Sequence, residues 1–136
     1  MLRKDAKIEL IRRVPLFENC SKQELREVAG VADEVDLPAG TTLTKEGSTG
    51  REFVVIVDGF ADVRRKGRRV NTLGKGDFLG EIALVSGLPR TATVETTTPT
   101  RVLVLTDRAF RELLQRVPSM QFKILQALAR RLPQKD

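Results

Sequence analysis

The apolar positions of the chain follow three different periods, and each period predicts a different kind of secondary structure. From Lys4 to about Gly30 they recur every three or four residues, which is typical of helices with one buried face. Pro15 divides this stretch into two predicted helices. The second helix begins at Ser21, because Ser21 and Glu24 have the spacing of a capping box.

Between residues 31 and 106 the pattern changes to short apolar runs that are rich in β-branched residues and separated by glycines. Lys66-Gly67 and Pro38-Ala39-Gly40 have the composition of turns. Short strands at such spacing are typical of a small all-β barrel or sandwich. The predicted strands cover residues 31–37, 41–45, 52–57, 60–66, 68–73, 91–97 and 101–106.

Helical periodicity returns from residue 107 to residue 132. Asp107 or Thr106 can cap a helix that Pro118 ends, and Ser119 can cap a second one. We therefore predict an α+β fold, an antiparallel, jelly-roll-like β-roll between N-terminal and C-terminal helices. We interpret residues 1–136 as one domain, with helices in 1–30, the roll in 31–106 and two helices in 107–132.

Composition favours a binding module over an enzyme. The 136 residues carry a net charge of +6 and include no histidine and a single cysteine, Cys20. Serine-histidine-aspartate triads, histidine-ligated zinc and intramolecular disulfides are thereby excluded, which fits a reducing cytoplasm. The longest apolar run, Phe53–Val57, is far shorter than the ~20 residues of a membrane span, and the N-terminus does not resemble a signal peptide.

The segment Gly80 to Val94, GEIALVSGLPRTATV, carries the candidate chemistry. Its first residues predict one or two helical turns whose free N–H groups attract an anion. Arg90, held behind Pro89, offers a fork of donors that matches phosphate oxygens, and Thr91 adds a hydroxyl. A phosphate would repel Glu81, so we expect that carboxylate to accept hydrogen bonds from an uncharged group such as a ribose 2′-hydroxyl.

This segment resembles the phosphate-binding cassette of cyclic nucleotide-binding domains, a family that includes the catabolite activator protein, protein kinase A regulatory subunits and cyclic nucleotide-gated channels. The resemblance covers most of the chain and places the cassette, with its short helix, at residues 80–92. Upstream, the glycine-punctuated roll of the family resembles Leu37–Gly40, Glu46-Gly47, Gly50, Asp58–Val63 and Gly76–Gly80.

The resemblance implies a role for individual residues. Arg90 would hold the cyclic phosphate with the backbone N–H groups of Ala83 and Thr91, while Glu81 and the backbone at Gly80 would hold the ribose. Arg131 matches a position that pairs with the ribose-binding acid in some members. The residues implied to contact the ligand are the cassette's Gly80, Glu81, Ile82, Ala83, Arg90, Thr91 and Ala92, the base-pocket residues Val63 and Val70, and Arg131.

The chain departs from the family pattern in two places. Ser48 stands where the family usually carries an acid, which we interpret as a detail of the turn after Gly47. The chain also stops at Asp136, about where family members bring in residues that cap the base, so no output domain is expected within it.

The expected ligand is cAMP, because the overall pattern resembles bacterial sensors. The alternative cGMP stays open, since Thr91 could reach a guanine 2-amino group. No metal or other cofactor is implied. The last predicted helix spreads its apolar residues over about 200° of its circumference, against the roughly 100° needed to pack on one core. That helix could close over the nucleotide as a lid, pair with a second copy in a homodimer, or pack on two sides.

We therefore interpret the chain as a regulatory cyclic nucleotide sensor that acts on an effector domain or protein elsewhere. One alternative is a nucleotide-silent roll that serves as a protein-interaction part of a channel or kinase assembly. Another is nucleic-acid binding through the basic hairpin at 64–69. That hairpin has no aromatic neighbour for base stacking, and no helix-turn-helix pattern follows Leu132, so a solvated hairpin is preferred.

Overall fold

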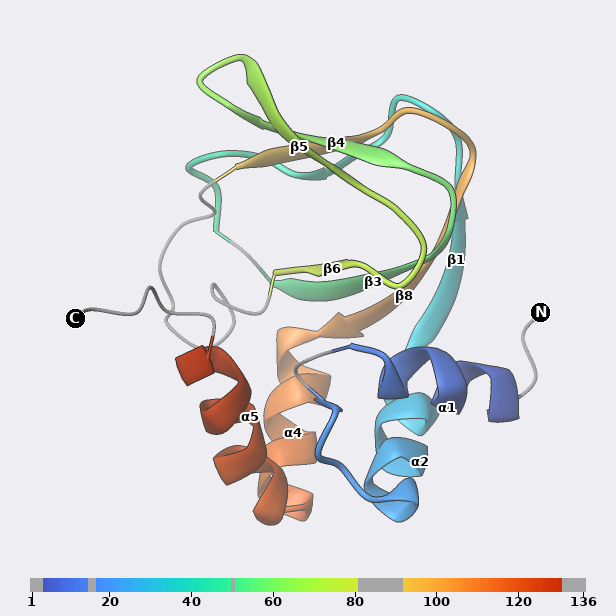
Figure 1. Cartoon of the computed structure of the whole chain (residues 1–136), viewed down its shortest axis with the longest axis vertical. Coiled ribbons are helices and arrows are strands. Elements are labelled where there is room, and N and C mark those ends of the chain that lie inside the picture. Colours follow the sequence, from blue (N-terminus) through green and yellow to red (C-terminus); the bar gives the residue numbers. More distant parts are fainter. Residues whose placement is uncertain (1–3, 15–16, 50, 81–91, 131–136) are drawn as a thin grey trace. The chain divides into compact units, whose positions relative to one another are not determined.

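The structure is a computed structural model that describes residues 4–14, 17–49, 51–80 and 92–130 (Figure 1). The chain divides into two compact units, a helical one (residues 1–31 and 108–136) and a roll (residues 32–107). The helical unit contains α1 (Lys4–Arg12), α2 (Lys22–Val31), α4 (Asp107–Arg116) and α5 (Ser119–Arg130). Within the described residues, no helix is long and apolar enough to cross a membrane.

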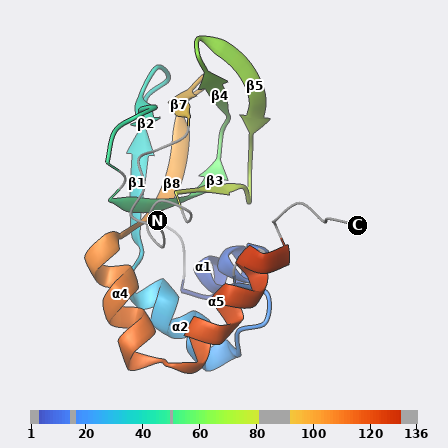
Figure 2. The ribbon, with the colours of Figure 1, turned by 90° about the vertical axis from the view of Figure 1, so that its left-hand side faces the viewer.

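The described residues of the roll form eight strands in two antiparallel sheets, with orders β1-β8-β3-β6 and β2-β7-β4-β5. Figures 1 and 2 show the two sheets of this unit facing each other. The predicted α+β roll is thus confirmed, while the short helix expected at the start of the cassette lies outside the described residues. The strands are β1 (Asp33–Leu37), β2 (Thr42–Thr44), β3 (Glu52–Asp58), β4 (Ala61–Arg65), β5 (Arg68–Leu73), β6 (Phe78–Leu79), β7 (Thr93–Thr96) and β8 (Thr100–Thr106).

Two local differences separate this structure from the sequence-based prediction. The helix α2 continues through Val31, which the prediction placed in a strand, because a β-branched residue lowers helix propensity only slightly. The two-residue strand β6 was not predicted, since Phe78 and Leu79 are too few to show an alternating pattern. All seven predicted strands are present, with bounds that shift by at most two residues.

The core of the roll lies between its two sheets. Val54, Ile56, Leu79 and Val102 of the first sheet form one buried cluster with Ala61 and Val94 of the second. The central strand β3 is buried from Phe53 to Val57, which matches its unbroken apolar run. Strand β5, by contrast, is an edge strand and is exposed along almost its whole length. The burial of a strand therefore depends on whether it lies inside a sheet or at its edge.

Two tight turns give the roll its corners. Gly59 has φ +105°, and a Cβ atom there would lie 2.5 Å from Thr100 Oγ1 and 2.7 Å from the Pro99 carbonyl oxygen. Lys66 and Gly67 both have positive φ, 52° and 78°, between the paired residues Arg65 and Arg68. This is the geometry of a two-residue type I′ hairpin, so the turn predicted at Lys66-Gly67 is confirmed.

In the helical unit, the predicted capping box is present and does more than begin α2. The Glu24 N–H donates to Ser21 Oγ at 3.1 Å, and Glu24 Oε1 accepts from the Ser21 N–H at 2.7 Å. The same buried carboxylate also accepts hydrogen bonds from Ser119, the first residue of α5, and from Lys123 one turn further on. One side chain thus joins the first turns of α2 and α5.

These hydrogen-bond partners determine the pKa of the Glu24 carboxyl group, which we call the helical joint because it connects α2 and α5. Burial by itself raises the pKa of Glu24, but the hydrogen bonds from Lys123, Ser119 and Ser21 outweigh it and lower the pKa from 4.5 to about 2. The neighbouring Cys20 thiol has its pKa raised to about 11 by burial and by the charge of Glu24. A thiol with so high a pKa is a poor nucleophile, in keeping with a structural role for Cys20.

Candidate functional site

The two ends of the predicted cassette lie on different sheets. At one end, Leu79 pairs with Val54 at the edge of the first sheet, and Gly80 follows with φ +100°, a conformation that favours glycine. At the other end, the Ala92 carbonyl oxygen accepts a hydrogen bond from Thr44 Oγ1 at 3.0 Å, and Thr93 then begins β7 in the second sheet. The two ends of this segment are therefore attached to different sheets of the roll.

Apart from Gly80, the residues expected to contact the phosphate and ribose fall between these two anchors. They lie outside the described residues, as does the predicted partner of the ribose-binding acid on the last helix. These residues are Glu81, Ile82, Ala83, Arg90, Thr91 and Arg131.

The structure brings Val63 close to the end of the cassette. Val63 lies on β4 between Asn71 of β5 and Val94 of β7, and Val94 follows Ala92 by two residues. The Val63 side chain is half-buried and packs against the core cluster between the sheets. An apolar, half-buried side chain at this place fits the expected wall for a base.

Val70 has a different environment. Val63 pairs with Asn71 while the next residue, Arg64, pairs with Arg69, so the register leaves Val70 without a partner on β4. Such an extra residue is a β-bulge, and it bends the strand locally. Val70 is 52% exposed on the edge strand, so its side chain is more accessible to solvent than that of Val63, the other residue expected to contact the base.

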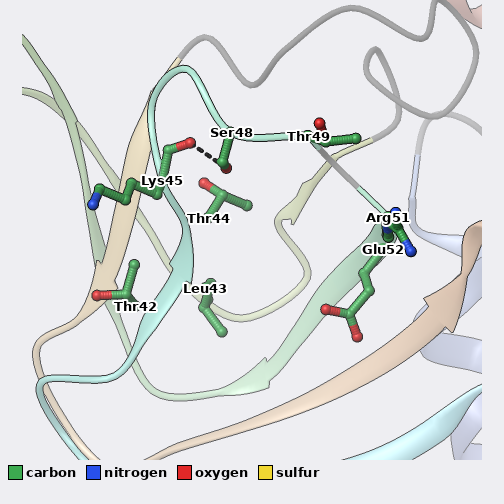
Figure 3. A pocket seen from close by; sticks show the side chains of 8 residues that line it. All are labelled: Thr42, Leu43, Thr44, Lys45, Ser48, Thr49, Arg51 and Glu52. Atoms are coloured by element: carbon green, nitrogen blue, oxygen red, sulfur yellow. Dashed lines mark hydrogen bonds between the residues drawn. The ribbon is translucent and has the colours of Figure 1, made fainter.

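A pocket of about 350 Å³ opens beside β2 and the start of β3 (Figure 3). The positive groups at it are Lys45 and Arg51, which lie on opposite sides of Thr44 in the figure. Neither has an ion pair with another described residue. Sequence reasoning missed this pocket, although cations that flank a glycine-punctuated loop were a usable signal. Its lining residues are Thr42, Leu43, Thr44, Lys45, Ser48, Thr49, Arg51 and Glu52.

The loop that follows β2 ties this pocket to the rest of the second sheet. Ser48 closes its turn, because both its N–H and its hydroxyl donate to the Lys45 carbonyl oxygen, at 3.0 and 2.6 Å. The Glu46 N–H donates to Thr93 Oγ1 at 2.9 Å, next to the end of the cassette, and Glu46 Oε1 accepts from the Lys66 N–H at 3.0 Å. The serine that replaces the family's usual acid thus acts within its own turn.

Comparison with known proteins gives related proteins over most of the chain. A family model for the cyclic nucleotide-binding domain matches residues 34–117. A cAMP-dependent protein kinase regulatory subunit from Eremothecium gossypii is 36% identical over 107 residues, which cover 78% of this chain and 23% of the relative. The corresponding subunit from Schizosaccharomyces pombe is 33% identical, with coverages of 77% and 26%. The chain thus spans about a quarter of the length of these curated relatives.

Solved structures agree with this relationship. The N-terminal domain of a transcriptional regulator from Streptomyces coelicolor matches with a TM-score of 0.81 and 31% identity, covering 90% of this chain and 91% of that one. A cyclic nucleotide-binding domain from Methylobacillus flagellatus matches with a TM-score of 0.80, 26% identity and coverages of 93% and 74%. A third match, with a TM-score of 0.76 and 28% identity, covers 81% of this chain and 41% of the other. It is a mutant regulatory subunit of a cAMP-independent protein kinase A from Trypanosoma brucei, bound to cAMP.

Three observations give the same assignment. They are the two-sheet fold, the attachment of the segment 80–92 to both sheets, and the family match over residues 34–117. The chain belongs to the cyclic nucleotide-binding domain family.

Proposed function

We propose that this chain binds cAMP in its roll and acts as a regulatory module rather than as an enzyme. The observation that carries the proposal is the segment GEIALVSGLPRTA, residues 80–92, whose ends the roll holds on its two sheets. A backbone anchored in this way can present N–H groups and an arginine at a fixed spacing. A preorganised donor set of this kind suits a cyclic phosphate, which carries a single negative charge.

The proposed contacts of the ligand are those that membership of the cyclic nucleotide-binding domain family implies for these residues. Arg90 binds the cyclic phosphate together with the N–H groups of Ala83 and Thr91, while Glu81 and Gly80 bind the ribose 2′-hydroxyl. Ile82 belongs to the same helical turn. The base lies against the half-buried Val63, with Ala92 and the more exposed Val70 beside it. Arg131, the residue after α5, pairs with Glu81.

The decisive experiment is a calorimetric titration with cAMP and with cGMP, repeated on Arg90→Leu. Two or three charge-assisted hydrogen bonds at about 1.5–3 kcal/mol each support micromolar affinity, so the variant should bind at least about 100-fold more weakly. Arg26→Leu, an exposed arginine on α2, is the matched control and should leave the affinity unchanged. Equal affinity of Arg90→Leu would contradict the cassette assignment.

Tighter binding of cAMP than of cGMP would support the choice of ligand. The names of the cAMP-dependent kinase relatives favour this outcome. Tighter binding of cGMP would instead assign the Thr91 hydroxyl to the guanine 2-amino group. A flat titration with both nucleotides would leave the alternative of a silent roll used for protein contacts.

A double-mutant cycle tests the role of Glu81 in ribose binding. Glu81→Ala and the ligand 2′-deoxy-cAMP each remove one side of the proposed hydrogen bond, so each should weaken binding by about tenfold. Combining the two should add almost nothing further. Fully additive losses would show that Glu81 acts elsewhere.

The output of the module passes through the C-terminal helices, which close over the bound nucleotide as a lid. Phe122 and Leu125, three residues apart on α5, are 64% and 61% exposed and are available for a new contact. Hydrogen exchange of residues 119–130 should slow when cAMP binds. If slowing instead depends on protein concentration, the same face pairs with a second copy.

The kinase relatives support an effector outside these residues, since the chain spans only about a quarter of their length. We propose that residues 1–136 form a single domain of such an assembly. A reducing, cytoplasmic setting fits its lone cysteine.

A further inference from the structure

The turn between β4 and β5 carries the densest group of positive charges in the chain. Five of the six residues from Arg64 to Arg69 are cations, and all six are exposed. In Figures 1 and 2 this turn lies at the outer end of the roll unit. We call Arg64–Arg69 the arginine hairpin.

The arginine hairpin keeps like charges directly opposite each other. The antiparallel register pairs Arg64 with Arg69 and Arg65 with Arg68. Like charges in such cross-strand positions destabilise a sheet. Asp62 neutralises only Arg64, at 3.4 Å, and the Arg65–Arg68 pair has no ion pair among the described residues. Charged side chains protect a sheet edge against aggregation, but that role does not require like charges to face each other.

The backbone of the hairpin is also strained. Lys66 is the one described residue other than glycine with a positive φ, 52°, where asparagine, aspartate or glycine would be favoured. The carboxylate of Glu46 holds this turn in place by accepting the Lys66 N–H. Unfavourable charge pairing and an unfavourable backbone conformation thus coincide in the hairpin, and backbone strain of this kind clusters at functional sites.

The remainder of the roll unit has the opposite charge. Residues 32–107 contain ten basic and eleven acidic residues, and the arginine hairpin holds five of the basic ones. The rest of the unit therefore carries a net charge of −6. A nucleic acid is disfavoured as the partner, because the rest of the unit carries a net negative charge and the hairpin has no aromatic side chain for base stacking. Within the roll unit the hairpin lies at one end (Figures 1 and 2), so a flat anionic surface can contact the hairpin apart from the rest of this unit.

We propose that the arginine hairpin docks on the surface of an anionic phospholipid bilayer. Four of its five cations are arginines, whose guanidinium groups bind phosphate oxygens in pairs. Lipid phosphates and carboxylates relieve the repulsion between the facing arginines, and the acidic remainder of the unit is held away from the membrane. The unit is thereby oriented with its hairpin toward the lipid.

Vesicle flotation with the full chain tests this proposal. Vesicles of phosphatidylcholine containing roughly 30 mol% phosphatidylserine should bind the protein at about 0.1 M salt, and pure phosphatidylcholine should not. Arg65→Gln combined with Arg68→Gln removes one facing pair. Each arginine near an anionic bilayer is worth about a fivefold change in affinity, so the pair should cost about 25-fold.

The matched control removes the same charge elsewhere. Lys22→Gln with Arg26→Gln, two exposed positions on α2, should change vesicle binding by less than about twofold. The thermal midpoint separates binding from folding: the Arg65/Arg68 variant should melt at the same temperature as the native chain or higher, because a repulsive pair is gone. Cyclic nucleotide titration of both variants keeps this test independent of the proposed function.

Three outcomes would overturn the proposal. The first is no binding to phosphatidylserine vesicles, which would leave the hairpin as a solvated edge. The second is an equal loss of vesicle binding in the Lys22/Arg26 control, which would show that only the net charge of the chain matters. The third is tighter binding of a short duplex DNA than of the vesicles with the same dependence on Arg65 and Arg68, which would make nucleic acid the partner.

Discussion

The two units of this protein join their elements by different chemistry. In the helical unit, the first turns of α2 and α5 meet at one buried carboxylate, Glu24, with a lysine and two serines around it. In the roll, the ion pair between Asp36 of β1 and Arg101 of β8 is exposed, and part-buried contacts between distant segments are made by neutral groups. Thr96 Oγ1 accepts the Thr41 N–H and donates to the Pro38 carbonyl oxygen, both at 2.8 Å.

The difference has an energetic meaning. A neutral hydroxyl network loses only its own hydrogen bonds when it is broken, whereas removing one member of a buried ionic cluster leaves a charge behind. The roll relies instead on close fit, most of all at Gly59, where the backbone of residues 99 and 100 approaches within the space of a side chain. The stability of the helical unit should therefore depend on pH and on the charge of Glu24. The stability of the roll should depend on how closely its atoms fit together.

The largest effect is expected from Gly59→Ala. Its Cβ would overlap Thr100 Oγ1 and backbone atoms of residues 99 and 100, at a φ of +105° that alanine rarely adopts. We expect a loss of about 3–5 kcal/mol in the free energy of unfolding, measured by urea denaturation. Gly47→Ala is the control, with φ +84° and open space around it, and should cost about 1 kcal/mol. Equal losses of stability in the two variants would show that the positive φ, and not the close contact with residues 99 and 100, requires a glycine at position 59.

Glu24→Gln comes next and tests the ionic joint. The substitution leaves Lys123, with 26% of its side chain exposed, without its buried partner. A loss of about 2–3 kcal/mol is expected, below that of a fully buried pair. Adding Lys123→Met should recover much of it, because the stranded charge is then removed. If the double variant is as unstable as the sum of the two single variants, the joint is not an ionic unit.

Thr96→Val tests the neutral network with nearly the same side-chain volume. The Thr41 N–H and the Pro38 carbonyl oxygen each lose a partner, although Thr41 Oγ1 still donates to Pro38 at 2.7 Å. The expected loss is about 1–2 kcal/mol and should be the same at pH 7 and pH 3. A loss that varies with pH would show that the network is coupled to a titrating group.

The smallest effect is expected from a change of one pH unit, which acts on the free energy of unfolding through Glu24. The pKa of Glu24 is about 2 in the folded chain against 4.5 as its ordinary value, so its contribution is complete above pH 4.5 and is lost as pH falls toward 2. The native chain should lose stability by at most about 1.4 kcal/mol per pH unit through this group. Glu24→Gln should flatten that part of the curve, and an unchanged curve would assign acid sensitivity to other carboxylates.

Much of the frame could be predicted from the sequence. Periodicity placed the helices and seven strands, and the Ser21–Glu24 spacing located the cap of α2, because these signals act over a few residues. The further contacts of Glu24 could not be predicted, since Ser119 and Lys123 lie about a hundred positions away. The two-residue β6 is too short for a pattern, and only its pairing with β3 makes it a strand.

The candidate site divides in the same way. Its motif and the apolar character of Val63 are local properties that the sequence contains. The bulge at Val70 depends on the register between β4 and β5, which no local pattern specifies. The facing arginines of the hairpin likewise follow from that register, although their number was plain from the sequence.

The pairing of β1 with β8 has a consequence for modular use of the roll. Asp33, near the entry of the unit, is the pairing partner of Val104, near its exit. Chain entry and exit are thus neighbours, a condition under which a unit can be spliced into a loop of another protein without separating the flanking residues. A graft of residues 32–107 into an exposed loop of a host would need only short connectors at either end.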